Sequence, residues 1–260
     1  MRIIVVWAFA AAVFAAAPLV RADTVGWRTL VLGRSVQGDP IRAIELGDLD
    51  GERSALVVGC IHGNECAGIA IALRLAQLRP PPETDLWIVP NLNPDGAAAG
   101  TRGNARGVDL NRNFPWRWRP LFAGYYSGSR PLSEPETRIA LRLLARIHPT
   151  VSIWFHQHLD LVDDPSATAV ADRFAEASGL RLGSLPREPG SATTWETHCL
   201  PGGAAFVVEL PAGRVPPARA LRLARAVNAA VASAPARRPG VRRSCLIGAR
   251  RRAPDRLVYP

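Results

Sequence analysis

His62-Gly-Asn-Glu65 places an imidazole and a carboxylate three residues apart, directly after an apolar run. This pair can supply half of a catalytic zinc site, because such a site needs three protein ligands and an open position for water. A histidine from elsewhere in the chain would complete a His2Glu set of ligands. The tetrapeptide is not specific by itself, so the prediction depends on three further islands of polar residues. They lie at 93–102 with 108–115, at 154–157 and at 206–211.

These islands lie at or beyond the ends of predicted strands. Alternating hydrophobicity predicts a β-hairpin from 28–34 and 40–46. Apolar runs predict buried strands at 55–61, 86–89, 151–155 and 204–209. Helical patterns and capping residues, among them Ser133, predict helices over 66–78, 133–147, 167–178 and 217–232, with a long loop over 90–130.

The order of these elements predicts an α/β fold with a mixed, largely parallel central sheet and helices on both faces. Ligand sites in open α/β sheets form at the carboxyl ends of the strands, which is where the polar islands fall. The islands can therefore meet in one site.

The first 22 residues have the pattern of a secretory signal peptide. Arg2 precedes an uncharged apolar stretch over 3–20, and small residues surround a cleavage point after Ala22. The stretch is Ala-rich and short for a membrane anchor, so we expect no stable membrane insertion after cleavage. The rest of the chain suits one catalytic domain over 23–233, followed by an Arg-rich tail over 234–260. The expected location is secreted, periplasmic or at the cell envelope.

Export changes what the four cysteines can do, because an oxidising compartment permits disulfides. Cys60, Cys66, Cys199 and Cys245 allow three pairings, and the sequence does not choose among them. The formal net charge is +10, and much of it lies in the tail. Such a tail can contact anionic polymers or remain solvated. No nucleic-acid-binding motif accompanies it, so we expect no nucleic-acid partner.

Taken together, the islands resemble the zinc carboxypeptidases of the carboxypeptidase A family, and in particular its small secreted bacterial members. The similarity extends from the hairpin to Glu209, which is nearly the whole expected domain. It implies a secreted metallocarboxypeptidase with one zinc ion per chain, which hydrolyses the last peptide bond of a peptide with a free C-terminal carboxylate. Three alternatives remain open: an amidase or carboxypeptidase of diaminopimelate-containing cell-wall stem peptides, a zinc deacylase of N-acyl amino acids, and a non-catalytic peptide-binding protein.

The resemblance assigns the metal ligands and the general base. His62 and Glu65 match two ligands, and His156, which ends an apolar strand as the family's third ligand does, is preferred to His158. Glu209 matches the general base, which would accept a proton from a zinc-activated water and protonate the leaving amine. A carboxylate at the end of an apolar strand loses hydration unless it is paired or used, which fits a functional role.

The resemblance also assigns groups that would bind the substrate. Asn111 and Arg112 match the pair that holds the terminal carboxylate, for which the guanidinium fork is suited. Arg102 matches the arginine that stabilises the developing oxyanion, and Arg106 is close enough in sequence to replace it.

The chain departs in one respect from the animal digestive members of the family. They carry a mobile tyrosine between the third metal ligand and the base, whereas this chain has no tyrosine from Ser127 to Val258. The segment 189–196 falls in that interval and is expected to line the specificity pocket. Glu196 would there favour a basic or amino-bearing side chain, and His158 would point into the pocket or face solvent.

Overall fold

The computed structural model describes residues 25–164, 167–236, 240–242 and 244–245. The expected signal peptide lies outside these residues, as do most arginines of the expected basic tail. Within the described ranges, no helix is long and apolar enough to cross a membrane.

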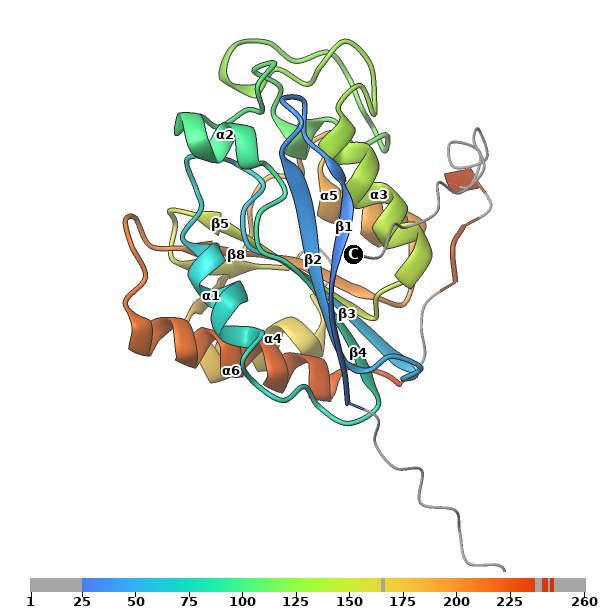
Figure 1. Ribbon diagram of the computed structural model, residues 1–260, viewed down its shortest axis with the longest axis vertical. Helices are drawn as coiled ribbons and strands as arrows, with labels where there is room; N and C mark the ends of the chain where they lie inside the picture. Colours follow the sequence, from blue (N-terminus) through green and yellow to red (C-terminus); the bar gives the residue numbers. More distant parts are fainter. Residues whose placement is uncertain (1–24, 165–166, 237–239, 243, 246–260) are drawn as a thin grey trace, which may run out of the picture.

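Eight strands of the described chain form one mixed sheet, in the order β1-β2-β4-β3-β5-β8-β6-β7 (Figure 1). The central strands β4, β3, β5 and β8 run parallel. The β1–β2 hairpin is antiparallel and joins β4 through an antiparallel pairing of β2, whereas β6 pairs antiparallel with β8 and parallel with β7. The prediction of a mixed, largely parallel sheet is confirmed. The strands are β1 (Val25–Arg34), β2 (Pro40–Asp48), β3 (Arg53–Val58), β4 (Thr84–Val89), β5 (Val151–Gln157), β6 (Leu161–Asp163), β7 (Arg181–Gly183) and β8 (Ala204–Leu210).

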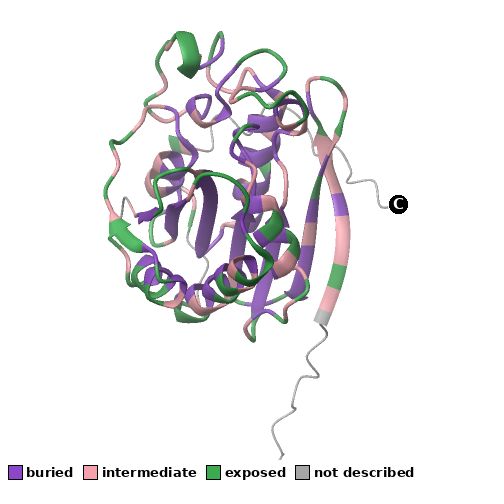
Figure 2. Ribbon diagram, turned by 90° about the vertical axis from the view of Figure 1, so that its left-hand side faces the viewer, coloured by how far each residue is buried: buried purple, intermediate pink, exposed green. Residues whose placement is uncertain are grey.

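Helices cover both faces of this sheet. In Figure 1, one face carries α1 (Gly68–Leu75), α4 (Ala169–Ser178) and α6 (Pro217–Ser233). The other face carries α3 (Pro135–Ile147) and α5 (Ala192–Cys199). The long loop contains the short helical segments α2 (Pro94–Ala99), η1 (Leu110–Arg112) and η2 (Ala123–Tyr125). Figure 2 shows that the central strands are mostly buried, whereas exposed residues lie on the loops, the outer sides of the helices and the edge strands β1 and β7.

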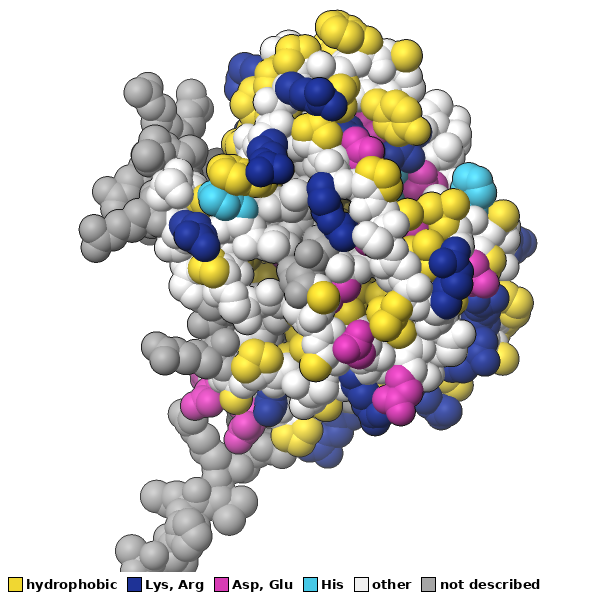
Figure 3. Space-filling view, turned by 180° about the vertical axis from the view of Figure 1, so that it is seen from behind, with side chains coloured by type: hydrophobic (Ala, Val, Ile, Leu, Met, Phe, Trp, Pro, Cys, Tyr) yellow, Lys and Arg dark blue, Asp and Glu magenta, His cyan; other side chains and the backbone are white. Residues whose placement is uncertain are grey.

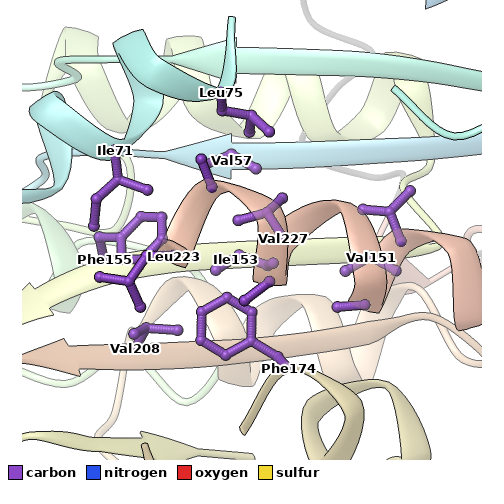
Figure 4. Close-up of a cluster of buried hydrophobic side chains, with 14 of the residues drawn as sticks. Val57, Ile71, Leu75, Val151, Ile153, Phe155, Phe174, Val208, Leu223 and Val227 are labelled. Carbon is purple, nitrogen blue, oxygen red and sulfur yellow. The ribbon is translucent and has the colours of Figure 1, made fainter. Parts of the chain in front are cut away.

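Each face of the sheet packs against its own hydrophobic core. On the first face, Val57, Ile153 and Val208 pack with Phe174 and Val227 of the covering helices (Figure 4). Burying one such side chain stabilises the fold by roughly 1.5–3 kcal/mol relative to leaving it exposed.

The second core lies under α3 and α5. Successive residues of a strand point to opposite faces of the sheet, so Leu56 and Trp154 point away from the first core. They belong to the second core together with Ile139 and Trp195. With both faces of the central strands covered, their carboxyl ends are the place where the chain can present polar groups to a pocket.

Two local features differ from expectation. The strands β6 and β7 have three residues each, which is too short for a periodicity to reveal them. The residue that caps α3 is Glu134, without a side-chain cap, and Ser133 Oγ instead donates to its carboxylate at 2.7 Å. Glu136, three residues after Ser133, accepts from Val36 N at 3.0 Å. A bond to the adjacent side chain and a bond to the loop between β1 and β2 have replaced the expected serine cap.

The disulfides select one of the three pairings, namely Cys60 with Cys66 and Cys199 with Cys245. The second bond joins α5 to the expected tail, where Arg242 N also donates to Cys199 O at 2.9 Å. The described part of this tail therefore packs against the domain. On the face shown in Figure 3, arginine side chains are scattered among acidic and hydrophobic ones.

Candidate active site

The turn between β3 and α1 positions His62 and Glu65. The Cys60–Cys66 disulfide closes a short loop around them, and Glu65 N donates to His62 O at 2.9 Å. Gly63 packs so closely against α2 that a Cβ would lie 1.9 Å from the carbonyl carbon of Gly96, so only glycine fits there. The turn holds both side chains toward the same point.

Three donor atoms converge at that point. His62 Nδ1 lies 2.9 Å from Glu65 Oε2, and His156 Nδ1 lies 3.0 Å from Glu65 Oε2 and 3.1 Å from His62 Nδ1. Tetrahedral ligands about 2.0–2.1 Å from zinc would lie about 3.3 Å from one another, which is close to these separations. All three side chains are buried. Two imidazole nitrogens and a carboxylate oxygen are donors that zinc prefers, so the cluster fits a single zinc ion.

The protonation states of Glu65 and His156 also suit a metal. Burial alone would raise the pKa of Glu65, but hydrogen bonds and charge from His156 and His62 hold that pKa well below its usual range. Burial lowers the pKa of His156 to about 4. At neutral pH the cluster therefore contains an ionised carboxylate and a neutral imidazole, which are the forms that bind metal.

Asp109 fixes the other side of the His62 ring, and the sequence did not single it out. Its Oδ1 lies 2.9 Å from His62 Nε2, and its backbone N donates to Tyr126 O at 2.7 Å. Burial lowers the pKa of His62, but the charge and hydrogen bond of Asp109 outweigh this and raise it. Such a carboxylate determines which ring nitrogen faces the metal site. The available signal was an aspartate two residues before the Asn111-Arg112 pair.

Replacing Asp109 with alanine is expected to weaken zinc binding by about tenfold to a hundredfold, because His62 would lose the partner that orients its ring. Competition with a chromogenic chelator would measure the affinity. The matched control is Asp172→Asn on the exposed side of α4, which should bind zinc as the native protein does. Equal affinities for native protein and Asp109→Ala would show that this carboxylate does not support the metal site.

The end of β8 places Glu209 directly beside His156. The two residues are partners in the parallel pairing of β5 with β8, and Leu161 of β6 lies opposite Glu209 on the other side. Glu209 Oε2 is buried and has no hydrogen-bond partner among the described residues. Burial, followed by the negative charge of Glu65, raises the pKa of Glu209 to about 7. A carboxylate of this kind can accept and return a proton near neutral pH.

Arg102 lies against the same cluster. Its Nη1 donates to Glu65 Oε1 at 2.6 Å, and its Nε donates to Asp109 Oδ2 at 2.9 Å. The competing Arg106 is directed elsewhere, since its Nη1 lies 3.5 Å from Glu134 Oε2 and its side chain is not part of the pocket. The structure therefore brings Arg102, and not Arg106, to the cluster.

Arg112 and Asn111 follow on the 3-10 turn η1. The Arg112 side chain is buried, and its Nε lies 3.5 Å from Glu188 Oε2. Asn111 Oδ1 accepts from Ala192 N at 2.9 Å, which orients the amide. The ring of Tyr125 lies 5.5 Å from the Arg112 guanidinium carbon, so it covers one face of that group.

One cavity of about 310 Å³ joins these groups. His158 is exposed at its edge, and Ser191, Thr193 and Thr194 line it from the segment that was expected to do so. Tyr125 brings a phenol ring to the cavity from the long loop, where no sequence pattern indicated its position. The expected site residues in its lining are His62, Glu65, Arg102, Asn111, Arg112, His156, His158 and Glu209.

Glu196 is absent from this lining, which corrects the prediction made for it. The segment around it forms α5, and this helix turns Glu196 toward the sheet, where the residue is 2% exposed. Trp154 Nε1 donates to Glu196 Oε1 at 2.7 Å. Burial raises the pKa of this carboxyl to about 7. Glu196 is thus a buried structural acid, because the helix directs its neighbours Thr193 and Thr194 to the cavity instead.

This burial gives a testable pH dependence. The pKa of Glu196 is higher in the folded protein than its ordinary value of 4.5, so the native protein loses stability as the pH rises from about 4.5 to about 7. Glu196→Gln removes this loss and can still accept from Trp154. We expect the variant to be more stable by on the order of 3 kcal/mol at pH 8, and by less than about 1 kcal/mol at pH 5.

Denaturant unfolding of native protein and Glu196→Gln at both pH values would measure this difference. The exposed Glu176→Gln should change stability equally little at either pH. A stability difference that does not depend on pH would mean that Glu196 ionises normally in the fold.

Comparison with known proteins defines the class. Residues 82–167 match the family model described as zinc carboxypeptidase. Murein peptide amidase A of Escherichia coli K12 is 32% identical over 188 residues, which cover 65% of this chain and 77% of that protein. The chain belongs to the zinc carboxypeptidase family and is a hydrolase, as the sequence predicted.

Two further relatives extend the comparison. The crystal structure of murein-tripeptide amidase from Escherichia coli O157 matches with a TM-score of 0.65 at 27% identity, covering 80% of this chain and 92% of that chain. Carboxypeptidase SOL1 of Arabidopsis thaliana is 34% identical over 145 residues, which cover 50% of this chain and 28% of that protein. The carboxypeptidase A-like fold is thereby confirmed, and the zinc dependence of the family agrees with the donor cluster.

Proposed function

We propose that this protein hydrolyses the amide bond before the C-terminal residue of a peptide, with one zinc ion held by His62, Glu65 and His156. The observation that carries this proposal is the convergence of those three donors with Glu209 and Arg112 in one cavity. The cavity thus combines a metal site, a base and a carboxylate-binding group.

A bound zinc ion would lower the pKa of a coordinated water to about 7 and polarise the scissile carbonyl. Glu209 would accept the proton of the attacking water and transfer it to the leaving amine. Arg102 would stabilise the negative charge that develops on the carbonyl oxygen, because its guanidinium has N–H donors beyond the two that bind Glu65 and Asp109.

Arg112 would bind the terminal carboxylate. Its contact with Glu188 at 3.5 Å is too long for a good hydrogen bond, so a substrate carboxylate can take its place on the guanidinium fork. Asn111 would donate from its amide nitrogen, since its oxygen is occupied by Ala192 N. A peptide with a blocked carboxyl end would lose these charge-assisted bonds.

Among peptides, we propose short cell-wall stem peptides that end in diaminopimelate as the substrate class. The relatives named murein peptide amidase support this choice, and each is matched over most of its length. Ordinary peptides are the second candidate, supported by the relatives named carboxypeptidase. We also propose a secreted or cell-envelope location, which the two disulfides support because such bonds persist in oxidising compartments.

The proposal is tested with zinc-loaded protein and a substrate panel. L-Ala-γ-D-Glu-meso-diaminopimelate should be hydrolysed with a higher kcat/KM than ordinary peptides or N-acyl amino acids. Amidation of the carboxylate next to the scissile bond should lower kcat/KM by about a hundredfold or more. Faster hydrolysis of ordinary peptides would mean that they, and not stem peptides, are the substrate class. No hydrolysis of any peptide would contradict the proposed reaction.

A further inference from the structure

An ion pair between a buried aspartate and an exposed arginine lies in the wall of the same cavity. Asp163, at the end of β6, is 4% exposed, and its Oδ2 accepts from Arg187 Nη1 at 2.8 Å. Its Oδ1 accepts from Leu185 N at 2.9 Å. Asp163 and Arg187 both line the cavity, and the Arg187 side chain is 37% exposed. The proposed reaction gives neither residue a role.

Strand register locates this pair relative to the proposed base. In the antiparallel pairing of β6 with β8, Leu161 lies opposite Glu209 and Asp163 lies opposite Val207. Val207 and Glu209 point to the same side of β8 and are about 6.5–7 Å apart along the strand. Val207 also lines the cavity. A terminal residue with its scissile bond at Glu209 and its carboxylate on Arg112 would therefore direct its side chain toward Val207 and Asp163.

This part of the cavity offers both signs of charge. Arg187 has N–H donors beyond the one that binds Asp163, and each Asp163 oxygen can accept a second hydrogen bond. The next residue, Glu188, adds a half-exposed carboxylate, and its backbone O is held by Thr194 Oγ1 at 3.2 Å. An apolar side chain would desolvate these groups without pairing them, which is costly. A side chain with only an ammonium would be repelled by Arg187, and a side chain with only a carboxylate would be repelled by Asp163.

We propose that Asp163 and Arg187 determine specificity by binding a zwitterionic side chain of the C-terminal residue. The distal carboxylate would bind the Arg187 guanidinium, and the distal ammonium would bind Asp163, with Glu188 nearby. This inference rests on the proposed function, because the side chain of a terminal meso-diaminopimelate ends in these two groups. It makes the ion pair a recognition element and not only an anchor for the segment after β7.

Three matched substrates separate the two contacts. They are the tripeptides L-Ala-γ-D-Glu-X in which X is meso-diaminopimelate, L-lysine without the distal carboxylate, or L-2-aminopimelate without the distal amine. Native protein should prefer the diaminopimelate peptide to each of the others by about a hundredfold or more in kcat/KM, because a site built to pair a polar group rejects an analogue that lacks it.

Each variant should lose one of these preferences. Arg187→Gln should reduce the preference over the lysine peptide by at least about tenfold, and Asp163→Asn should reduce the preference over the aminopimelate peptide by a similar factor. Because each result is a ratio within one protein preparation, partial misfolding of a variant does not affect it. Arg173→Gln on the exposed side of α4 serves as the control and should leave both ratios unchanged.

The outcomes distinguish this inference from the function on which it rests. If native protein hydrolyses the three peptides but Arg187→Gln and Asp163→Asn lower all rates equally, the pair is only a structural anchor and the inference is overturned. The same holds if native protein shows no preference among the three. If native protein hydrolyses none of them, the proposed function fails and the inference fails with it.

Discussion

Glu209→Gln is expected to lower kcat by about 10²–10⁴-fold while the protein still binds zinc with native affinity. Glutamine has nearly the same shape as glutamate, but it cannot accept the proton of the attacking water. Glu209 is beside His156 in the sheet, and its buried Oε2 has no hydrogen-bond partner among the described residues, so this oxygen is available to a water at the metal site. Steady-state kinetics with the γ-linked tripeptide, together with a zinc-binding titration, would measure both quantities.

The matched control for this variant is Glu52→Gln, which changes an exposed glutamate outside the cavity and should leave kcat unchanged. Normal turnover by Glu209→Gln would show that Glu209 is not the general base. Loss of zinc together with loss of turnover would indicate instead that Glu209 supports the metal site.

Arg112→Ala is expected to lower kcat/KM by on the order of 10³-fold, mainly through a higher KM. Each charge-assisted hydrogen bond contributes about 1.5–3 kcal/mol, and the guanidinium fork can supply two of them to a carboxylate. These bonds exist in both the bound substrate and the transition state, so their loss weakens binding more than it slows the chemical step.

A substrate without the carboxylate provides the decisive comparison. For a tripeptide amidated next to the scissile bond, Arg112→Ala and native protein should have nearly equal kcat/KM, because the interaction is already missing. Arg106→Ala is the control, since Arg106 lies close in sequence but faces Glu134 outside the cavity. If Arg112→Ala slows the amidated and the free peptide by the same factor, Arg112 does not bind the carboxylate.

Much of the site was predictable because its positions follow from local pattern. His156 and Glu209 each end an apolar strand, and parallel strands bring their carboxyl ends to one edge of the sheet. His62 and Glu65 need only one turn to reach the same point. Residue type, spacing and strand order predicted that these four residues can meet in one site, and the family resemblance assigned their roles.

Other features depend on side-chain direction and on tertiary packing, which a single sequence does not reveal. Glu196 was expected in the pocket because its segment lies in the right interval, but one helical turn directs it to Trp154. Tyr125 reaches the cavity through an irregular loop. Asp163 lies on a strand of three residues, so neither its burial nor its pairing with Arg187 had a periodic signal.

The most direct test of the account is the turnover of the γ-linked tripeptide as zinc is returned to metal-free protein. Activity should be absent after chelation and should rise in proportion to added zinc until one equivalent per chain is bound, with no further increase. His156→Ala should not regain activity under the same conditions, because it lacks one of the three donors. Full turnover by thoroughly metal-free protein would contradict the proposed zinc chemistry.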